Sequence, residues 1–210
     1  MIDLLKDRDK LLELYRPGTQ DFTLVDVPEL PFAVIDGEGP PEQGAAPAIK
    51  ALYQAILPIR RQARERAGKA FVEPPVEMLY RTDDPEPGAG KGWKWRVMVT
   101  LPAWADADTL AASVATAREH MDAAAPSPVF ERFAEGRCAQ ILHVGRTDDI
   151  PAMLERLHGR FMPDHGLEPA GAWHEIYLDD WNRVAREQRR IILRQPVRPR
   201  AGNSHHGSMS

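Results

Sequence analysis

A carboxylate stands among aromatic residues in residues 173–178, whose sequence is WHEIYL and whose composition is typical of a short β-strand. Successive side chains of a strand point to opposite faces, so Trp173, Glu175 and Tyr177 share one face. His174 lies on the other face, which excludes a dyad with Glu175. An acid between two aromatic rings is the lining that a flat, apolar or cationic ligand requires.

A second run with the same pattern occurs at residues 75–80, with the sequence PVEMLY. An alignment of the two runs places Glu77 on Glu175, with Tyr80 near the end of the first run. A fold that is built twice, with an acid at the same place in each half, predicts a ligand site between the halves. Glu77 then either shares the site or lies on its opposite rim.

Glu175 is the candidate for acid–base chemistry. Aromatic cover disfavours the charged form of a carboxyl group, which raises its pKa toward the range of a general base. An ionised Glu175 is also suited to attract a cationic ligand. The structural alternative is a carboxylate that is hydrogen-bonded to a neighbouring strand, to Arg96 or to Arg194, because unpaired acids are rarely buried.

The aromatic candidates each have two interpretations. Tyr177 and Tyr80 either donate a proton to a ligand carbonyl or are strand aromatics whose polar tips reach water. Trp93 and Trp95 share one face of the alternating run 93–101, where they either stack on a planar ligand or belong to the core. Trp173 is a further candidate for ligand binding.

His143 is the last binding candidate, although a lone strand histidine usually has a structural partner. The acids and histidines show no metal-binding spacing, and no Ser-His-acid motif is present, so we expect neither a metal nor a cofactor. The single cysteine, Cys138, excludes an intrachain disulfide and indicates inert packing.

The elements that must position these residues form two similar units. The first has strands at 32–37, 71–81 and 93–101 and a helix at 47–68 with a kink at Pro58; the second has strands at 137–145, 173–178 and 190–197 and a helix at 151–166. This order predicts an α+β fold with duplicated strand-helix-strand-strand units, antiparallel sheets, helices on one side and a groove between the halves.

The domain is expected to span 1–197. A short amphipathic helix at 1–16 comes first, followed by pseudo-repeats at about 22–125 and 126–197. A Gly- and Pro-rich hairpin loop is expected at 85–92, and a disordered tail at 198–210.

Composition bounds the possible functions. The 210 residues are 43% hydrophobic and 28% charged, with a net charge of −4, which argues against a nucleic-acid surface. No apolar run approaches the ~18 residues of a membrane span, and the charged amino terminus is unlike a signal peptide. We therefore expect a cytoplasmic monomer or homodimer that binds a hydrophobic aromatic small molecule, without nucleic acid or membrane.

Several strings of this sequence resemble, in the same order, the GyrI-like small-molecule-binding family. They are residues 24–29, 35–39, 93–95, 140–145, 174–178 and 192–197, and the likeness covers roughly residues 1–197. The resemblance implies the duplicated unit described above and a groove that binds flat, hydrophobic, often cationic compounds. Some members are effector domains of transcription regulators; here no helix-turn-helix precedes the domain, so DNA binding is not expected.

The amino-terminal extension and Trp93-Lys94-Trp95 resemble the stand-alone cyclopropanoid cyclopropyl hydrolases. That resemblance implies hydrolysis of the strained cyclopropane of yatakemycin- and duocarmycin-type DNA alkylators, which gives resistance, with Glu175 acting on a water molecule. The family commonly has tryptophan where this chain has Tyr80. The alternatives are a non-catalytic protein that sequesters toxins and a gyrase-protecting protein.

Overall fold

The computed structural model describes residues 8–82 and 92–201. The helices are α1 (Arg8–Tyr15), α2 (Pro41–Ala55), α3 (Leu57–Ala67), α4 (Ala107–Ala117), α5 (Ile150–Arg156) and α6 (Met162–Asp164), with a π-helical segment at Leu157–Phe161. Short 3₁₀ turns lie at Gly68–Ala70, Arg118–His120, Thr147–Asp149 and Arg186–Gln188. The strands are β1 (Thr23–Val27), β2 (Leu30–Glu38), β3 (Val76–Thr82), β4 (Trp93–Thr100), β5 (Val129–Phe133), β6 (Gly136–Val144), β7 (Leu167–Pro169), β8 (Trp173–Tyr177) and β9 (Arg190–Pro199).

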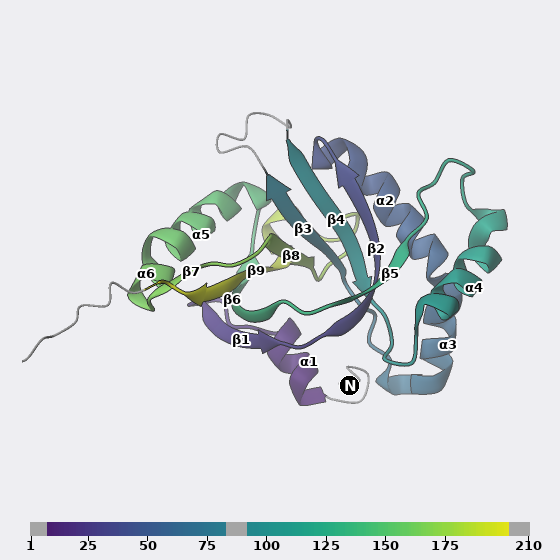
Figure 1. The fold of residues 1–210 in the computed structure, drawn as a ribbon, viewed down its shortest axis with the longest axis horizontal. Coiled ribbons are helices and arrows are strands. Elements are labelled where there is room, and N and C mark those ends of the chain that lie inside the picture. Colours follow the sequence, from purple (N-terminus) through teal and green to yellow (C-terminus); the bar gives the residue numbers. More distant parts are fainter. Residues whose placement is uncertain (1–7, 83–91, 202–210) are drawn as a thin grey trace, which may run out of the picture.

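Within the described ranges the nine strands form one antiparallel sheet in the order β1-β6-β9-β8-β3-β4-β2-β5, with β7 paired to β9 off this path (Figure 1). In the first half β4 lies between β3 and β2, and in the second half β9 lies between β8 and β6. The halves join where β3 pairs with β8. The α+β duplication is therefore confirmed, but the expected pair of sheets is a single continuous sheet.

The two edge strands are exchanged between the halves. A five-residue strand, two linking residues and a nine-residue strand occur twice, as β1–β2 and as β5–β6. β1 pairs with β6 of the second half, while β5 pairs with β2 of the first half. The sequence did not indicate β5, because its residues follow Pro126 and Pro128 and resemble a break between units. The exchange ties the halves together at both ends of the sheet.

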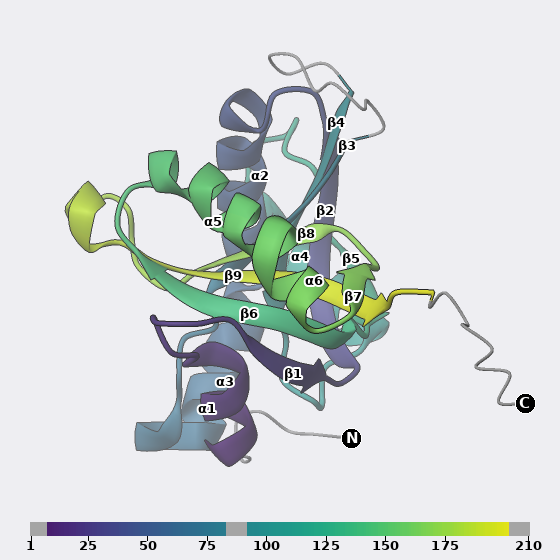
Figure 2. The same cartoon turned by 90° about the vertical axis from the view of Figure 1, so that its left-hand side faces the viewer.

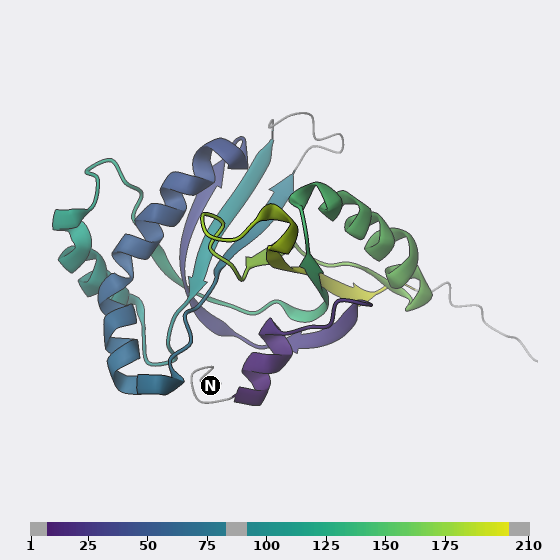
Figure 3. The same cartoon turned by 180° about the vertical axis from the view of Figure 1, so that it is seen from behind.

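One face of the sheet carries the long helices (Figure 3). α2, α3 and α4 cover the first half, and α5 and α6 run across β6 and β9 of the second half (Figure 2). The predicted break at Pro58 is confirmed, since α2 ends at Ala55 and α3 begins at Leu57. The helix begins at Pro41 rather than at Pro47, which lies inside α2.

The opposite face encloses a second core against α1. Leu14 and Tyr15 of α1 pack there with apolar residues of β1, β2, β3, β6, β8 and β9. β3 begins at Val76 instead of Phe71, because Pro74 and Pro75 have no N–H groups to donate to a ladder.

The chain ends differ slightly from expectation. β9 continues to Pro199 and pairs with the short strand β7, so residues 198 and 199 belong to the sheet and not to the tail. The rest of the predicted tail after Ala201, and the hairpin loop up to residue 91, lie outside the described residues.

Candidate functional site

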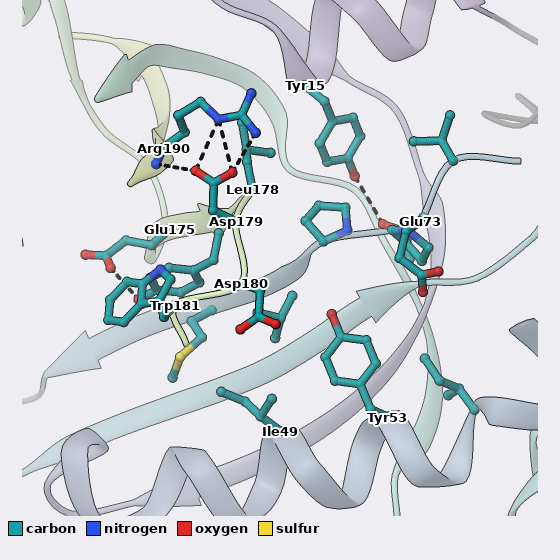
Figure 4. Close-up of a pocket in the computed structure, with 18 of the residues that line it drawn as sticks. Tyr15, Ile49, Tyr53, Glu73, Glu175, Leu178, Asp179, Asp180, Trp181 and Arg190 are labelled. Carbon is teal, nitrogen blue, oxygen red and sulfur yellow. Dashed lines mark hydrogen bonds and ion pairs between the residues drawn. The ribbon is translucent and has the colours of Figure 1, made fainter. Parts of the chain in front are cut away.

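A cavity of about 2120 Å³ lies at the junction of β3 and β8, and Figure 4 shows part of its lining. Both halves line it: Met78 and Tyr80 come from β3, and Glu175 and Tyr177 come from β8. Its walls are completed by side chains of α1, α2 and the segment that follows β8. The groove between the halves is therefore where the duplication predicted it.

Glu175 lies at the junction with both carboxylate oxygens occupied. The Trp173 indole Nε1–H donates to Oε1 at 3.0 Å, and the Tyr177 hydroxyl donates to Oε2 at 2.6 Å. Burial raises the pKa of Glu175 above its ordinary value, and these two hydrogen bonds offset the rise only in part. The pKa of this carboxyl group is thus closer to neutral pH than the pKa of an exposed glutamate.

The two tyrosines continue this chain of hydrogen bonds. The hydroxyl oxygens of Tyr177 and Tyr80 lie 2.7 Å apart, and the Tyr80 hydroxyl also lies 3.3 Å from Met78 Sδ. Burial raises the pKa of both phenols, and the nearby Glu175 adds to the rise. Since the Tyr177 proton goes to Glu175, the proton between the two hydroxyls is that of Tyr80, and the hydrogen bonds run in one direction from Tyr80 through Tyr177 to Glu175.

The segment after β8 forms a wall of the cavity, although none of its residues was a candidate from the sequence. The Trp181 ring packs edge-on against Tyr177, with 5.0 Å between the ring centroids, and is 36% exposed. Asp179 accepts hydrogen bonds from Arg190. Both Asp179 and the neighbouring Asp180 line the cavity (Figure 4). An acid pair followed by tryptophan, directly after the candidate strand, was the available signal.

Tyrosines from α1 and α2 reach the cavity on the side away from Glu175 (Figure 4). Tyr53 comes from α2, and burial raises its pKa to about 12. Tyr15 comes from α1 and contacts Thr100 at 3.1 Å, and both residues line the cavity. Neither tyrosine was a sequence candidate, because helix periodicity alone marks them as core positions.

Glu77 is not on the cavity face. In the strand register Glu77 pairs with Ile176, whereas Glu175 pairs with Met78, so the two acids point to opposite faces. The alignment that superposed them was off by one residue, and a one-residue slip reverses the face of every side chain. The corrected alignment superposes Tyr80 on Tyr177, the two residues whose hydroxyls meet.

Glu77 instead belongs to a buried polar network. The Tyr15 hydroxyl donates to its Oε1 at 2.8 Å, and His174 Nε2 lies 3.1 Å from Oε2 in an ion pair. His174 Nδ1 contacts Glu135 at 2.9 Å, and Arg194 donates to the other oxygen of Glu135 at 3.0 Å.

The charges of this network set the pKa values of its members. Burial alone would lower the pKa of His174, but Glu135 and Glu77 outweigh it and raise the pKa to about 9. Burial would raise the pKa of Glu135, but His174 and Arg194 lower it to about 2. Two carboxylates and two cations therefore balance inside the core.

The remaining candidates do not line the cavity. Trp95 is buried in the core against Gly37 and Gly44, where a Cβ on either glycine would overlap its indole ring. Trp93 packs edge-on against Tyr80, with 6.4 Å between the ring centroids, and Trp173 acts through its hydrogen bond to Glu175.

His143 lies on the same face as Tyr177, because both pair with Ile191 of β9. Its Nε2 contacts the Arg146 carbonyl at 2.9 Å, so the ring is held by the backbone rather than turned into the cavity.

The residues at 8–82 and 92–201 contain no group of three or more His, Cys, Asp or Glu side chains that could hold a metal ion. Over the same ranges, every helix is too short or too polar to cross a membrane.

The chain matches the model of the GyrI-like small molecule binding domain over residues 20–195. A comparison with curated protein sequences gave no significant match. Among solved structures, an uncharacterized conserved protein from Listeria innocua is 28% identical with a TM-score of 0.80, covering 94% of this chain and 100% of that one. A hydrolase from the same organism is 26% identical with a TM-score of 0.73, with the same coverage. Another hydrolase structure from Listeria innocua is 26% identical with a TM-score of 0.76, covering 94% and 99%.

Proposed function

Because the chain belongs to the GyrI-like small molecule binding domain family, we propose that its cavity binds flat, hydrophobic, cytotoxic aromatic compounds and hydrolyses the cyclopropane of yatakemycin- and duocarmycin-type DNA alkylators. The observation that carries this proposal is the hydrogen-bonded chain Glu175–Tyr177–Tyr80 on the cavity wall. Similarity to two Listeria innocua hydrolases supports a hydrolytic reaction. The reaction would detoxify such compounds in the cytoplasm and so give resistance.

The step consumes one water molecule. Glu175 takes a proton from water while the water oxygen bonds to the cyclopropane methylene carbon. The strained carbon–carbon bond breaks, and its electron pair enters the conjugated dienone, whose carbonyl oxygen becomes a phenolate. Glu175 returns its proton through Tyr177 and Tyr80 to the phenolate oxygen, which restores the carboxylate and completes the addition of water. Ring strain and aromatisation supply much of the driving force, so positioning and modest base catalysis suffice.

The aromatic walls hold the substrate in place. Trp181 and Tyr177 meet edge to face on one side, and Tyr53 lies across the cavity (Figure 4). A planar ligand between them loses apolar surface to the protein, which favours binding by about 25 cal/mol per Å² of buried apolar surface.

The test follows the dienone absorbance of a duocarmycin-type cyclopropyl-indole alkylator. Wild type is expected to consume the dienone, and Glu175→Gln to do so about 10²- to 10⁴-fold more slowly, the usual contribution of a general base. Glu155→Gln, an exposed acid on α5, is the matched control and should retain the wild-type rate. Equal rates for wild type and Glu175→Gln would rule out the role assigned to Glu175.

A second candidate function is sequestration without turnover. It is favoured by the fact that both oxygens of Glu175 already accept hydrogen bonds, which suits a fixed electrostatic contact as well as a base. Mass spectrometry of the protein-bound compound separates the two functions. A bound compound of unchanged mass supports sequestration, and a mass increase of one water supports hydrolysis.

A further inference from the structure

A second polar group faces the cavity at the end formed by α1. Tyr15 and Thr100 both line the cavity, although each residue is only 9% exposed. Behind them lies Glu77, which does not line the cavity and whose Oε1 accepts from Tyr15 at 2.8 Å and from Thr100 at 3.0 Å. The two hydroxyl oxygens are themselves 3.1 Å apart.

Counting protons shows what these hydroxyls can offer to a ligand. Tyr15 and Thr100 have one hydroxyl proton each, and the Glu77 carboxylate has none. Three contacts join the three groups, so two protons can be distributed in three ways. In each of them both protons stay inside the triad, and each hydroxyl oxygen keeps at least one lone pair that can accept from a further donor.

The buried network holds Glu77 in this arrangement. His174 lies 3.1 Å from Glu77 Oε2, and on its other side the imidazole contacts Glu135, which Arg194 holds in turn. Turning a hydroxyl proton out of the triad would break one of the hydrogen bonds among these buried groups, which is costly away from water.

We propose that Tyr15 and Thr100 form an acceptor-only subsite, which selects aromatic ligands that carry an N–H or O–H donor at the end away from Glu175. This inference rests on the proposed binding of aromatic compounds in the cavity. Because Tyr15 and Thr100 accept there and do not donate, a ligand gains a hydrogen bond at this end only through a donor of its own.

Two fluorescent acridinium dyes test the subsite. Proflavine has two primary amino groups, whereas acridine orange has the same ring system with both amino groups dimethylated, so its amino groups have no N–H to donate. Titration with each dye gives a Kd for wild type, Tyr15→Phe and Thr100→Val. Thr23→Val, which removes the hydroxyl of an exposed residue of β1 outside the cavity, is the matched control.

Loss of one hydrogen bond should weaken proflavine binding about two- to tenfold in Tyr15→Phe and Thr100→Val. Acridine orange binding should change less than twofold in the same variants, and Thr23→Val should alter neither dye. Partial unfolding of a variant changes both apparent Kd values by the same factor, so the ratio of the two values for one variant is unaffected by it.

Two other outcomes overturn the inference, and they differ from each other. If the binding of both dyes is weakened equally in Tyr15→Phe and Thr100→Val, the subsite does not select donors, and the proposed binding of aromatic compounds is unaffected. Failure of wild type to bind either dye contradicts the proposed binding function, and the subsite then falls with it.

Discussion

Two buried glutamates show how the immediate neighbours of a residue decide its chemistry. Glu175 has only neutral donors, the Trp173 indole and the Tyr177 hydroxyl, so burial dominates and raises its pKa. Glu135 has His174 and Arg194 as cationic partners, which lower its pKa to about 2. The first is poised for proton transfer and the second is a permanent structural charge.

Tyr177→Phe should raise the pKa of Glu175 further. The Tyr177 hydroxyl stabilises the carboxylate by donating to it, so removing this donor favours the protonated form. The measurement is a ¹³C NMR titration of glutamate carboxyl groups, in which the Glu175→Gln spectrum assigns the signal. In the rate profile, base-dependent turnover should then be lost at a higher pH than in wild type.

The control for this prediction is Tyr53→Phe, which removes a cavity hydroxyl that is not a partner of Glu175. That variant should leave the Glu175 titration in place. A Glu175 midpoint that stays constant or falls in Tyr177→Phe would mean that the 2.6 Å hydrogen bond does not stabilise the carboxylate.

At the scale of elements, β8 serves two sites at once. Glu175 and Tyr177 point into the cavity, while His174 and Ile176 point into the core that α1 closes. Pairing with both β3 and β9 fixes this alternation. A slip of one residue would put a histidine in place of the acid on the cavity face and an acid in place of the histidine on the core face. The register of β8 is therefore as important to the site as the residues themselves.

The contact between α2 and the sheet depends on Gly37 and Gly44, which leave room for Trp95. Gly44→Ala would ordinarily stabilise a helix interior, by roughly 0.5–1 kcal/mol. Here the added methyl group meets a buried indole ring that Gly37 confines from the other side. We expect a loss of roughly 1–3 kcal/mol in the free energy of unfolding, the usual effect of overpacking, measured by urea denaturation.

Gly159→Ala is the matched control for this packing effect. Gly159 lies in the π-helical segment, and a Cβ there meets nothing within 4 Å. That variant should keep or slightly increase stability. If Gly44→Ala behaves like Gly159→Ala, the close contact between α2 and Trp95 does not constrain the fold.

At the scale of the whole molecule, the buried network joins parts of the chain that are distant in sequence. Tyr15 comes from α1, Glu77 from the first half, and His174, Glu135 and Arg194 from the second. Together with the β3–β8 pairing and the exchanged edge strands, it fixes the two halves relative to each other. The cavity between them is consequently a preformed site.

Stability should decrease on the alkaline side because of His174. Its pKa is raised from 6.5 to about 9 in the folded state, so its contribution is full below pH 6.5 and is lost as the pH rises toward 9. The expected loss is roughly 3 kcal/mol in the free energy of unfolding between these pH values, measured by urea denaturation. His174→Gln should abolish most of this slope.

The acid side should follow Glu135 in the opposite sense. Its pKa is lowered from 4.5 to about 2, so its contribution is full above pH 4.5 and is lost as the pH falls toward 2.

For the alkaline limb, the exposed His165 offers a matched control, and His165→Gln should keep the wild-type slope. An unchanged alkaline slope in His174→Gln would show that the network does not carry this pH dependence.

The sequence predicted the duplicated order of elements, the groove between the halves and a carboxylate flanked by aromatics on one face of β8. These follow from local periodicity, since strand alternation and the break at Pro58 depend on short-range sterics. The equivalence of Glu77 and Glu175 could not be settled in this way. Two runs with an acid near the middle align almost equally well in either of two registers.

What the sequence determined by itself is therefore most of the elements, without β5 and β7, and the face on which each side chain lies within its own strand. Only the tertiary structure decided which faces meet, because the pairing of β3 with β8 and the exchange of β1 and β5 are contacts between distant residues. In the folded protein Tyr80 lies beside Tyr177 and Glu175, and Glu77 lies in the core with His174. Tyr15 of α1 lies at the far end of the cavity. The direct partners of Glu175 lie in its own strand, but only the pairing of β3 with β8 added Tyr80 to their hydrogen-bonded chain.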